Sequence, residues 1–180
     1  MDRIKLQLFY VLVELFNLIY RVLFFYKLRN AYLRLFRINI GKGSSISGRA
    51  RFFSFNKLSL GNNSCINRDC IIDNRKGVFI GNNVSISHGV KIYSLGHNLY
   101  SPDFEVKGAP VVICDNVVIF SNVMIMPGVR VGCNAAILPG SVVTKDVPDK
   151  SVVAGNPARI KNKRECDLKY KVRHDYWFGL

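Results

Sequence analysis

Aliphatic residues recur at every sixth position through the middle of the chain. One position of each six-residue unit is held by Ile80, Ile86, Ile92, Ile113, Ile119, Ile125, Val131, Ile137 and Val143. Four residues later most units carry a small or β-branched residue, namely Val84, Val90, Val117, Val123, Val129, Ala135, Ser141 and Val147. A helix repeats near every 3.6 residues and a strand about every 2, so neither element alone produces this period. The pattern predicts a solenoid of short strands and tight turns, whose aliphatic and small positions form one continuous core.

The same repeat continues less regularly upstream. It is carried there by Ile40, Ile46, Phe52, Leu58, Leu60, Ile66 and Ile72. Two shifts of two residues interrupt it, one at Leu58 to Leu60 and one before Ile80, and they predict small insertions in the turns. The larger side chains of Phe52, Phe53 and Phe55 are expected of a terminal coil that caps the stack. We therefore expect residues 39–160 to form one all-β domain.

The repeat is lost once in its regular part, after Ile92. Residues 98–110 lack the period and contain proline and glycine, which predicts a loop that leaves the stack and rejoins it. Long loops in compact domains are often functional, and His97 stands at the start of this one. An imidazole held by a rigid scaffold suits a general base, because it titrates near neutral pH. We interpret His97 as the candidate catalytic residue, whereas His88 in a regular turn and His174 in the tail are more simply solvated side chains.

The first forty residues are basic and apolar. Between residues 6 and 26 the polar side chains follow one helical stripe, formed by Gln7, Tyr10, Glu14, Asn17 and Arg21. Apolar side chains cover the rest of this helix, so it needs a partner other than water. Packing on the solenoid or on sister subunits, insertion into the membrane interface, and a bilayer span are the three alternatives. A span would place Glu14 and Arg21 in the bilayer at a cost of about 2.5–3.5 kcal/mol each. We predict that residues 1–38 form a helical segment at the membrane interface, with packing in an oligomer as the alternative.

The amino-acid composition indicates which kinds of partner the protein can bind. Lys and Arg number 26 against 12 Asp and Glu, giving a net charge of +14. The basic residues gather in the first forty residues and in a short basic tail, residues 161–180. No nucleic-acid-binding signature accompanies them, so we expect an anionic membrane surface and no nucleic acid. Five cysteines without a C-x-x-C pair argue against a disulfide framework or a zinc ribbon and predict free thiols in a reducing compartment. They are Cys65, Cys70, Cys114, Cys133 and Cys166.

Three segments resemble the hexapeptide-repeat O-acetyltransferases. They are IGNNV at 80–84, SLGHN at 94–98, and the closing motif from LPGSVVTKDVP at 138–148 to AGNPAR at 154–159. The resemblance covers residues 40–161 and is strongest to the galactoside and maltose acetyltransferases and the sugar O-acetyltransferases of polysaccharide gene clusters. It implies a left-handed parallel β-helix with three hexads per coil, assembled as a homotrimer. It also implies acetyl-CoA as the acyl donor, bound between neighbouring subunits, and no metal.

The resemblance also implies roles for individual residues. The histidine that matches His97 takes the proton of the acceptor hydroxyl as its oxygen attacks the thioester in a direct transfer. Residues at the family's CoA contacts are Ser121, Gly140, Thr144, Lys145 and Arg159. Asn67 matches an acceptor-binding asparagine. The chain departs from the family at Val118 and Phe120, where many relatives carry Trp and Gly, so a stacking contact to CoA is lost and a bulky ring replaces glycine.

These observations favour an acetyl-CoA-dependent O-acetyltransferase that modifies a sugar or glycan precursor in surface polysaccharide biosynthesis. We expect it to lie in the cytoplasm, peripheral to the inner face of the cytoplasmic membrane. Asp103 and Glu105 in the loop are candidates to orient His97, with solvated carboxylates as the simpler interpretation. The alternatives are a membrane-associated solenoid that scaffolds partners, or a zinc carbonic anhydrase of the same fold, which needs three converging histidines.

Overall fold

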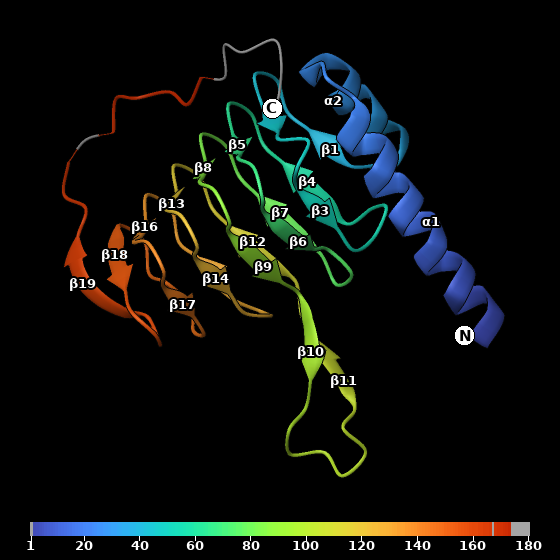
Figure 1. Cartoon of the computed structure of the whole chain (residues 1–180). Coiled ribbons are helices and arrows are strands. Elements are labelled where there is room, and N and C mark those ends of the chain that lie inside the picture. The colour runs from blue at the N-terminus through green and yellow to red at the C-terminus, as the bar shows by residue number, and fades with distance from the viewer. Residues whose placement is uncertain (1, 167, 174–180) are drawn as a thin grey trace.

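The chain forms a parallel β-solenoid that is covered at one end by two helices (Figure 1). The computed structural model describes residues 2–166 and 168–173. Helix α1 (Arg3–Val22) and helix α2 (Tyr26–Leu35) precede the first coil. In the described residues the solenoid comprises three parallel sheets, one of which gains an antiparallel final strand. The prediction of a hexapeptide-repeat solenoid with an N-terminal helical segment is therefore confirmed.

The strands are short and follow one another around the stack. The first three coils comprise β1 (Asn39–Ile40), β2 (Ser45–Ile46), β3 (Arg51–Phe52), β4 (Leu58–Leu60), β5 (Cys65–Ile66), β6 (Ile71–Asp73), β7 (Val78–Ile80), β8 (Ser85–Ile86) and β9 (Lys91–Tyr93). A hairpin of β10 (Leu95–His97) and β11 (Val106–Gly108) follows them. The remaining strands are β12 (Val111–Ile113), β13 (Val118–Ile119), β14 (Met124–Ile125), β15 (Arg130–Val131), β16 (Ala136–Ile137), β17 (Val142–Val143), β18 (Ser151–Ala154) and β19 (Arg159–Lys163).

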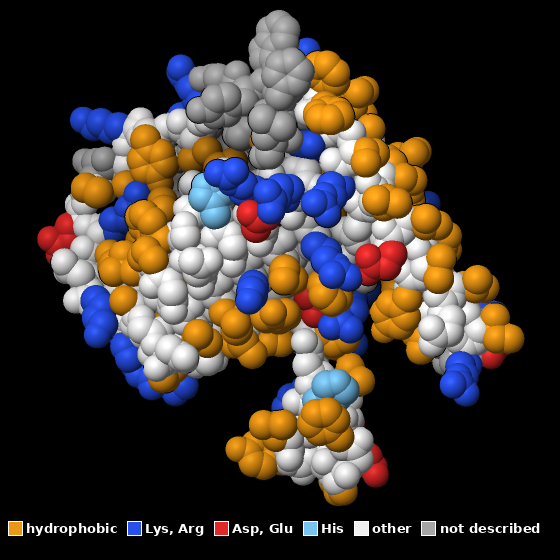
Figure 2. All heavy atoms as spheres, in the orientation of Figure 1, with side chains coloured by type: hydrophobic (Ala, Val, Ile, Leu, Met, Phe, Trp, Pro, Cys, Tyr) orange, Lys and Arg blue, Asp and Glu red, His pale blue; other side chains and the backbone are white. Residues whose placement is uncertain are grey.

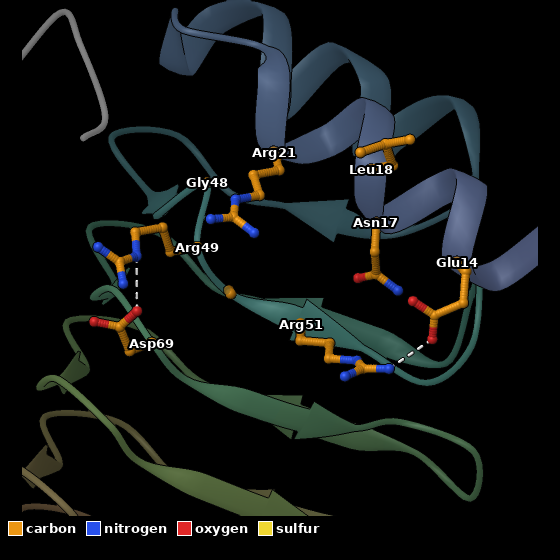
Figure 3. Close-up of a pocket in the computed structure, with 9 residues that line it drawn as sticks. Glu14, Asn17, Leu18, Arg21, Gly48, Arg49, Arg51 and Asp69 are labelled. Carbon is orange, nitrogen blue, oxygen red and sulfur yellow. Dashed lines mark hydrogen bonds and ion pairs between the residues drawn. The ribbon is translucent and has the colours of Figure 1, made fainter.

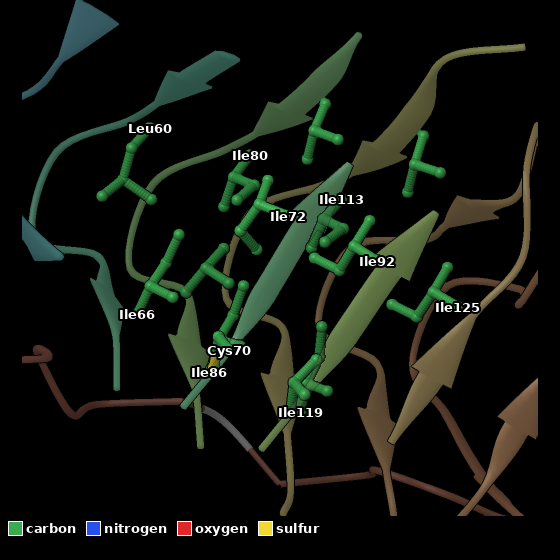
Figure 4. Close-up of a cluster of buried hydrophobic side chains, with 14 of the residues drawn as sticks. Leu60, Ile66, Cys70, Ile72, Ile80, Ile86, Ile92, Ile113, Ile119 and Ile125 are labelled. Carbon is green, nitrogen blue, oxygen red and sulfur yellow. The ribbon is translucent and has the colours of Figure 1, made fainter. Parts of the chain in front are cut away.

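The six-residue repeat sets the register of the sheets. Ile86 lies beside Ile66 on one side and beside Ile119 on the other, so equivalent positions of successive coils form a column. The aliphatic residues of every hexad from Ile80 to Val143 are buried, and their side chains fill the space between the sheets (Figure 4). The small residues predicted four positions later are buried as well. The core is thus the continuous column that the sequence pattern predicts.

Asparagine and glycine allow the coils to turn and to stack closely. Asn83, Asn116 and Asn134 occupy the same turn of three successive coils with φ of 55°, 58° and 61°, a conformation that asparagine tolerates better than most residues. Their side chains form a ladder, in which Asn83 Nδ2 donates to Asn116 Oδ1 at 2.8 Å and Asn116 Nδ2 to Asn134 Oδ1 at 3.0 Å. At the start of the same turn a Cβ on Gly61 would overlap the backbone of Gly81 in the next coil. These turns fix the spacing of the coils.

The N-terminal segment differs from the single helix expected through residue 26. Helix α1 ends at Val22, and the chain turns back through residues 23–25 before α2 begins. No glycine or proline marks this break. Its cause is packing: α2 folds back so that Leu33 is buried and Tyr32 stacks on Phe16 of α1, with ring centroids 5.2 Å apart. None of the helices in the described part of the chain is long and apolar enough to cross a membrane.

Helix α1 packs on the first coil along one face. Val13, Phe16 and Tyr20 are buried there, and the Tyr20 hydroxyl donates to the carbonyl of Ile46 at 2.8 Å. Asn17 binds the backbone of Phe52 through both of its amide atoms, at 2.9 Å each. Packing on the solenoid, one of the three alternatives for this helix, therefore accounts for its buried face. The opposite face remains exposed, and Figure 2 shows its hydrophobic side chains along the length of α1.

Candidate functional site

The interruption of the repeat is a β-hairpin that projects from the third coil (Figure 1). Strand β10 pairs antiparallel with β11, so that Leu95 lies opposite Gly108 and His97 opposite Val106. The chain therefore leaves the stack at Leu95, three residues before the predicted range of 98–110. Cross-strand hydrogen bonding explains the difference, because it recruits the last residues of the preceding hexad into the hairpin.

His97 lies at the outer end of β10, and its ring is held by Phe104. The two rings are nearly parallel, with centroids 4.3 Å apart and an interplanar angle of 4°. His97 Nδ1 lies 2.9 Å from the carbonyl oxygen of Phe104. A carbonyl oxygen accepts hydrogen bonds and cannot donate them, so in the neutral ring Nδ1 carries the proton and Nε2 carries the lone pair. The side chain is exposed, which leaves Nε2 accessible as a base.

The two loop carboxylates do not contact His97. Glu105 Oε1 accepts a hydrogen bond from Asn98 Nδ2 at 2.9 Å and so ties the two arms of the loop together. Asp103 is exposed. The residue that orients the histidine is Phe104, which sequence reasoning missed because it acts through its backbone carbonyl and its ring. Its positive φ of 48° is a backbone property that the residue type does not indicate.

Two of the residues predicted to contact CoA lie together at one corner of the stack. Ser121 follows β13, Gly140 follows β16 one coil later, and the Gly140 N–H donates to the Ser121 carbonyl at 3.0 Å. Gly140 has φ of 68°, and no other atom lies close to the position that a Cβ would take. Phe120, directly before Ser121, is 40% exposed. This corner therefore offers an accessible backbone beside an exposed aromatic ring.

Lys145 and Arg159 lie together elsewhere, at the last coils of the stack. Both line a cavity of about 250 Å³, together with Asp146, Pro148 and Ile160 among others. Both side chains are exposed, and neither forms an ion pair within the described residues. Thr144 is the exposed residue that precedes Lys145. The two cations outnumber the one carboxylate that lines the cavity, Asp146, so the cavity can receive an anionic group such as a phosphate.

Asn67 stands apart from these groups. It lies in the turn between β5 and β6 and is half-buried, and its Nδ2 donates to the carbonyl of Ile86 in the next coil at 2.9 Å. The structure gives it a role in stacking the coils and no contact with His97.

Among the residues that the structure describes, His88 and the cysteines form no second candidate site. His88 is exposed in the turn between β8 and β9, and His174 lies outside the described residues. Within residues 2–166 and 168–173, no group of three His, Cys, Asp or Glu side chains is placed to hold a metal ion. The five cysteines are free, and burial raises the pKa of the Cys70 thiol to about 12. Cys70 is thus an inert core residue at neutral pH.

Comparison with known proteins confirms the resemblance found in the sequence, although no family model matches the chain. The chain is 35% identical over 129 residues to a galactoside O-acetyltransferase of Escherichia coli, which covers 69% of this chain and 64% of that protein. It is 40% identical over 97 residues to a galactoside O-acetyltransferase of Lactococcus lactis, covering 51% and 46%. The chain thus spans about half to two thirds of the length of these curated relatives.

A solved structure supports the same conclusion over a larger part of the chain. A galactoside acetyltransferase in complex with coenzyme A superimposes with a TM-score of 0.82 at 26% identity, covering 97% of this chain and 92% of that one. The structural similarity therefore includes the N-terminal helices as well as the solenoid.

Proposed function

We propose that the protein is an acetyl-CoA-dependent O-acetyltransferase that modifies a hydroxyl group of a sugar or glycan precursor. Its sequence relatives include two galactoside O-acetyltransferases, and a structural neighbour is a galactoside acetyltransferase in complex with coenzyme A. The observation that carries the proposal is the hydrogen bonding of the His97 ring. Its Nδ1 is engaged by the Phe104 carbonyl, so its Nε2 is free to accept a proton. A general base on a hydroxyl is the group that O-acetylation requires.

The reaction follows from this arrangement in one transfer step. Nε2 of His97 takes the proton of the acceptor hydroxyl as the oxygen attacks the thioester carbonyl of acetyl-CoA. The resulting tetrahedral oxyanion collapses with cleavage of the carbon–sulfur bond, and the imidazolium returns the proton to the departing thiolate. The products are the O-acetyl sugar and CoA. Stacking on Phe104 keeps the imidazole in one orientation throughout.

Acetyl-CoA would be held by the regular coils that follow the hairpin. Lys145 and Arg159 present unpaired positive charge at one cavity, which suits the CoA phosphates. Thr144 lies beside them, and the Ser121–Gly140 corner offers backbone to the pantetheine arm. The exposed Phe120 ring provides an apolar contact in place of the aromatic residue that many relatives carry two positions earlier. Asn67 remains our candidate for acceptor binding.

The decisive experiment measures acetyl transfer from radiolabelled acetyl-CoA to glycans in a membrane preparation and then identifies the labelled glycan. His97→Ala should abolish labelling. His88→Ala is the matched control, because it removes the other described histidine, also exposed in a turn, and it should leave labelling intact. Retention of full activity by His97→Ala would refute the proposed base.

We further propose that the protein acts in surface polysaccharide biosynthesis as a homotrimer at the inner face of the cytoplasmic membrane. The support is the exposed apolar face of α1, where Leu8, Val11 and Leu15 are each about half exposed, and the surrounding basic residues. Deleting the helices would uncover the first coil, because Phe16, Tyr20 and Leu33 belong to the core. A sharper test replaces Leu8, Val11 and Leu15 by Gln, which should release the protein from membranes. Light scattering should give the mass of a trimer.

A further inference from the structure

A charged cavity lies between α1 and the first coils (Figure 3). Its volume is about 320 Å³. One wall is α1, and the other is the turn between β2 and β3 with Asp69 of the next coil. The lining residues are Glu14, Asn17, Leu18, Arg21, Gly48, Arg49, Ala50, Arg51 and Asp69. We call this the α1 cavity.

Three arginines converge on the α1 cavity, and two of them are already oriented. Arg51 is paired with Glu14 at 2.6 Å, and Arg49 with Asp69 at 2.8 Å. Each pair engages one guanidinium nitrogen, so the remaining N–H groups of both arginines are free to bind an anion. Arg21 forms no ion pair within the described residues, and Figure 3 shows its side chain directed from α1 toward the turn at Gly48 and Arg49. The cavity therefore holds an excess of positive charge in fixed geometry.

A fourth guanidinium lies behind the cavity wall. Arg29 of α2 is 3% exposed, and its Nε and Nη1 have no hydrogen-bond partner. The rings of Tyr20 and Tyr26 lie 5.9 Å and 5.6 Å from its guanidinium carbon and offset part of the charge. Its Nη2 lies so close to Gly48 that a Cβ there would overlap it. A buried cation without a carboxylate is costly, and an anion on the other side of Gly48 would compensate it.

We propose that the α1 cavity binds the phosphate group of an anionic membrane lipid. Arginine is the residue that best matches phosphate, since its planar N–H groups can donate two hydrogen bonds to one anion. A lipid is indicated because apolar surface begins at the cavity itself: Leu18 lines it and is 59% exposed, and Val22 on the next turn is 60% exposed. A helix lying in the interface would place these side chains among acyl chains and the cavity at the level of the headgroups. The inference rests on the membrane association proposed above and adds a specific site to it.

Vesicle binding tests the site against general electrostatic attraction. The full-length protein is titrated with phosphatidylglycerol–phosphatidylcholine vesicles and with pure phosphatidylcholine vesicles. Arg21→Gln with Arg49→Gln removes two charges from the cavity, and Lys5→Gln with Lys27→Gln removes two exposed charges outside it. Affinity for the anionic vesicles should fall by more than about 100-fold for the cavity pair and by about 30-fold for the control pair. Equal losses would overturn the site.

A second measurement locates the ligand directly and identifies its source. Titrating a water-soluble short-chain phosphatidylglycerol should shift the amide signals of Gly48, Arg49 and Ala50, and inorganic phosphate should shift them far more weakly. Equal affinity for both ligands would show a free-phosphate site and overturn the lipid assignment, as would shifts confined to other residues. Acetyl transfer to a soluble oligosaccharide is followed in parallel. If the wild-type protein transfers acetyl groups but binds no vesicles, this inference and the proposed membrane association are refuted and the proposed acetyl transfer stands. If it binds vesicles but transfers no acetyl groups, the proposed acetyl transfer is refuted and the lipid site stands.

Discussion

In the coils the side chains at the hexad positions are buried, whereas His97 and most of its neighbours in the hairpin are exposed. Strands inside the stack have a neighbour above and below and those at its ends have one, but β10 and β11 pair only with each other among the described strands. The coils therefore supply stability, and the hairpin presents a reactive side chain at little cost to the core. Substitutions in the hairpin should therefore lower activity, and substitutions in the coils should lower stability.

The largest effect is expected in the hairpin. His97→Asn removes the base while keeping a polar side chain of similar shape, and it should lower kcat for acetyl transfer by about 100-fold to 10,000-fold. The melting temperature should change little, because the side chain is exposed. Steady-state kinetics with acetyl-CoA and calorimetry check both parts. A large loss of stability would show that the hairpin helps to hold the fold together.

A core substitution should produce the reverse pattern. Ile125 is fully buried between Ile92 and Val143 of the neighbouring coils, so Ile125→Ala should lower the free energy of unfolding by about 2–5 kcal/mol. Met124 is the matched control, because it belongs to the same strand and points the other way. Met124→Ala should cost less than about 1 kcal/mol. Urea denaturation measures both, and similar losses would contradict the assignment of the core.

Substitutions in the last coils should weaken binding of acetyl-CoA without slowing the transfer step. Replacing Lys145 and Arg159 by Gln removes the two unpaired charges of their shared cavity. KM for acetyl-CoA should rise by about 10-fold or more, because each charge-assisted hydrogen bond contributes roughly 1.5–3 kcal/mol. The kcat should stay within about twofold. Arg130→Gln, a nearby exposed cation outside that cavity, serves as the control and should leave KM unchanged.

The smallest effect is a loss of stability at alkaline pH that originates in the core. Burial raises the pKa of Cys70 to about 12 from its ordinary value of 9.0, so the fold binds a proton that the unfolded chain releases above pH 9.0. Its contribution is present below pH 9.0 and falls as the pH rises toward about 12. Between about pH 9 and about pH 10 the wild-type protein should lose about 1 kcal/mol more than Cys70→Ala. An identical pH dependence of urea midpoints would contradict this.

The contrast between the coils and the hairpin also explains which features could be predicted from the sequence. The hexad residues revealed the solenoid because burial between sheets selects the same residue type in every coil, as in the column that contains Ile66, Ile86 and Ile119. The break in that pattern located the hairpin and His97. The role of Phe104 was not predictable, since a backbone carbonyl and a positive φ leave no mark on residue type. The turn at residues 23–25 was missed for a related reason: it results from packing between Tyr32 and Phe16 and has no local signal.

The final strand β19 has a consequence for the behaviour of the protein in solution. A stack of parallel strands ends in an edge whose free N–H and C=O groups can recruit another chain and seed a fibre. Here β19 reverses direction and pairs with β18, and the edge that it leaves is exposed along its length and carries Arg159, Lys161 and Lys163. Like charges on two such edges repel each other. At the end of this one sheet the reversal therefore disfavours edge-to-edge pairing between molecules, whereas the other two sheets end in β15 and β17.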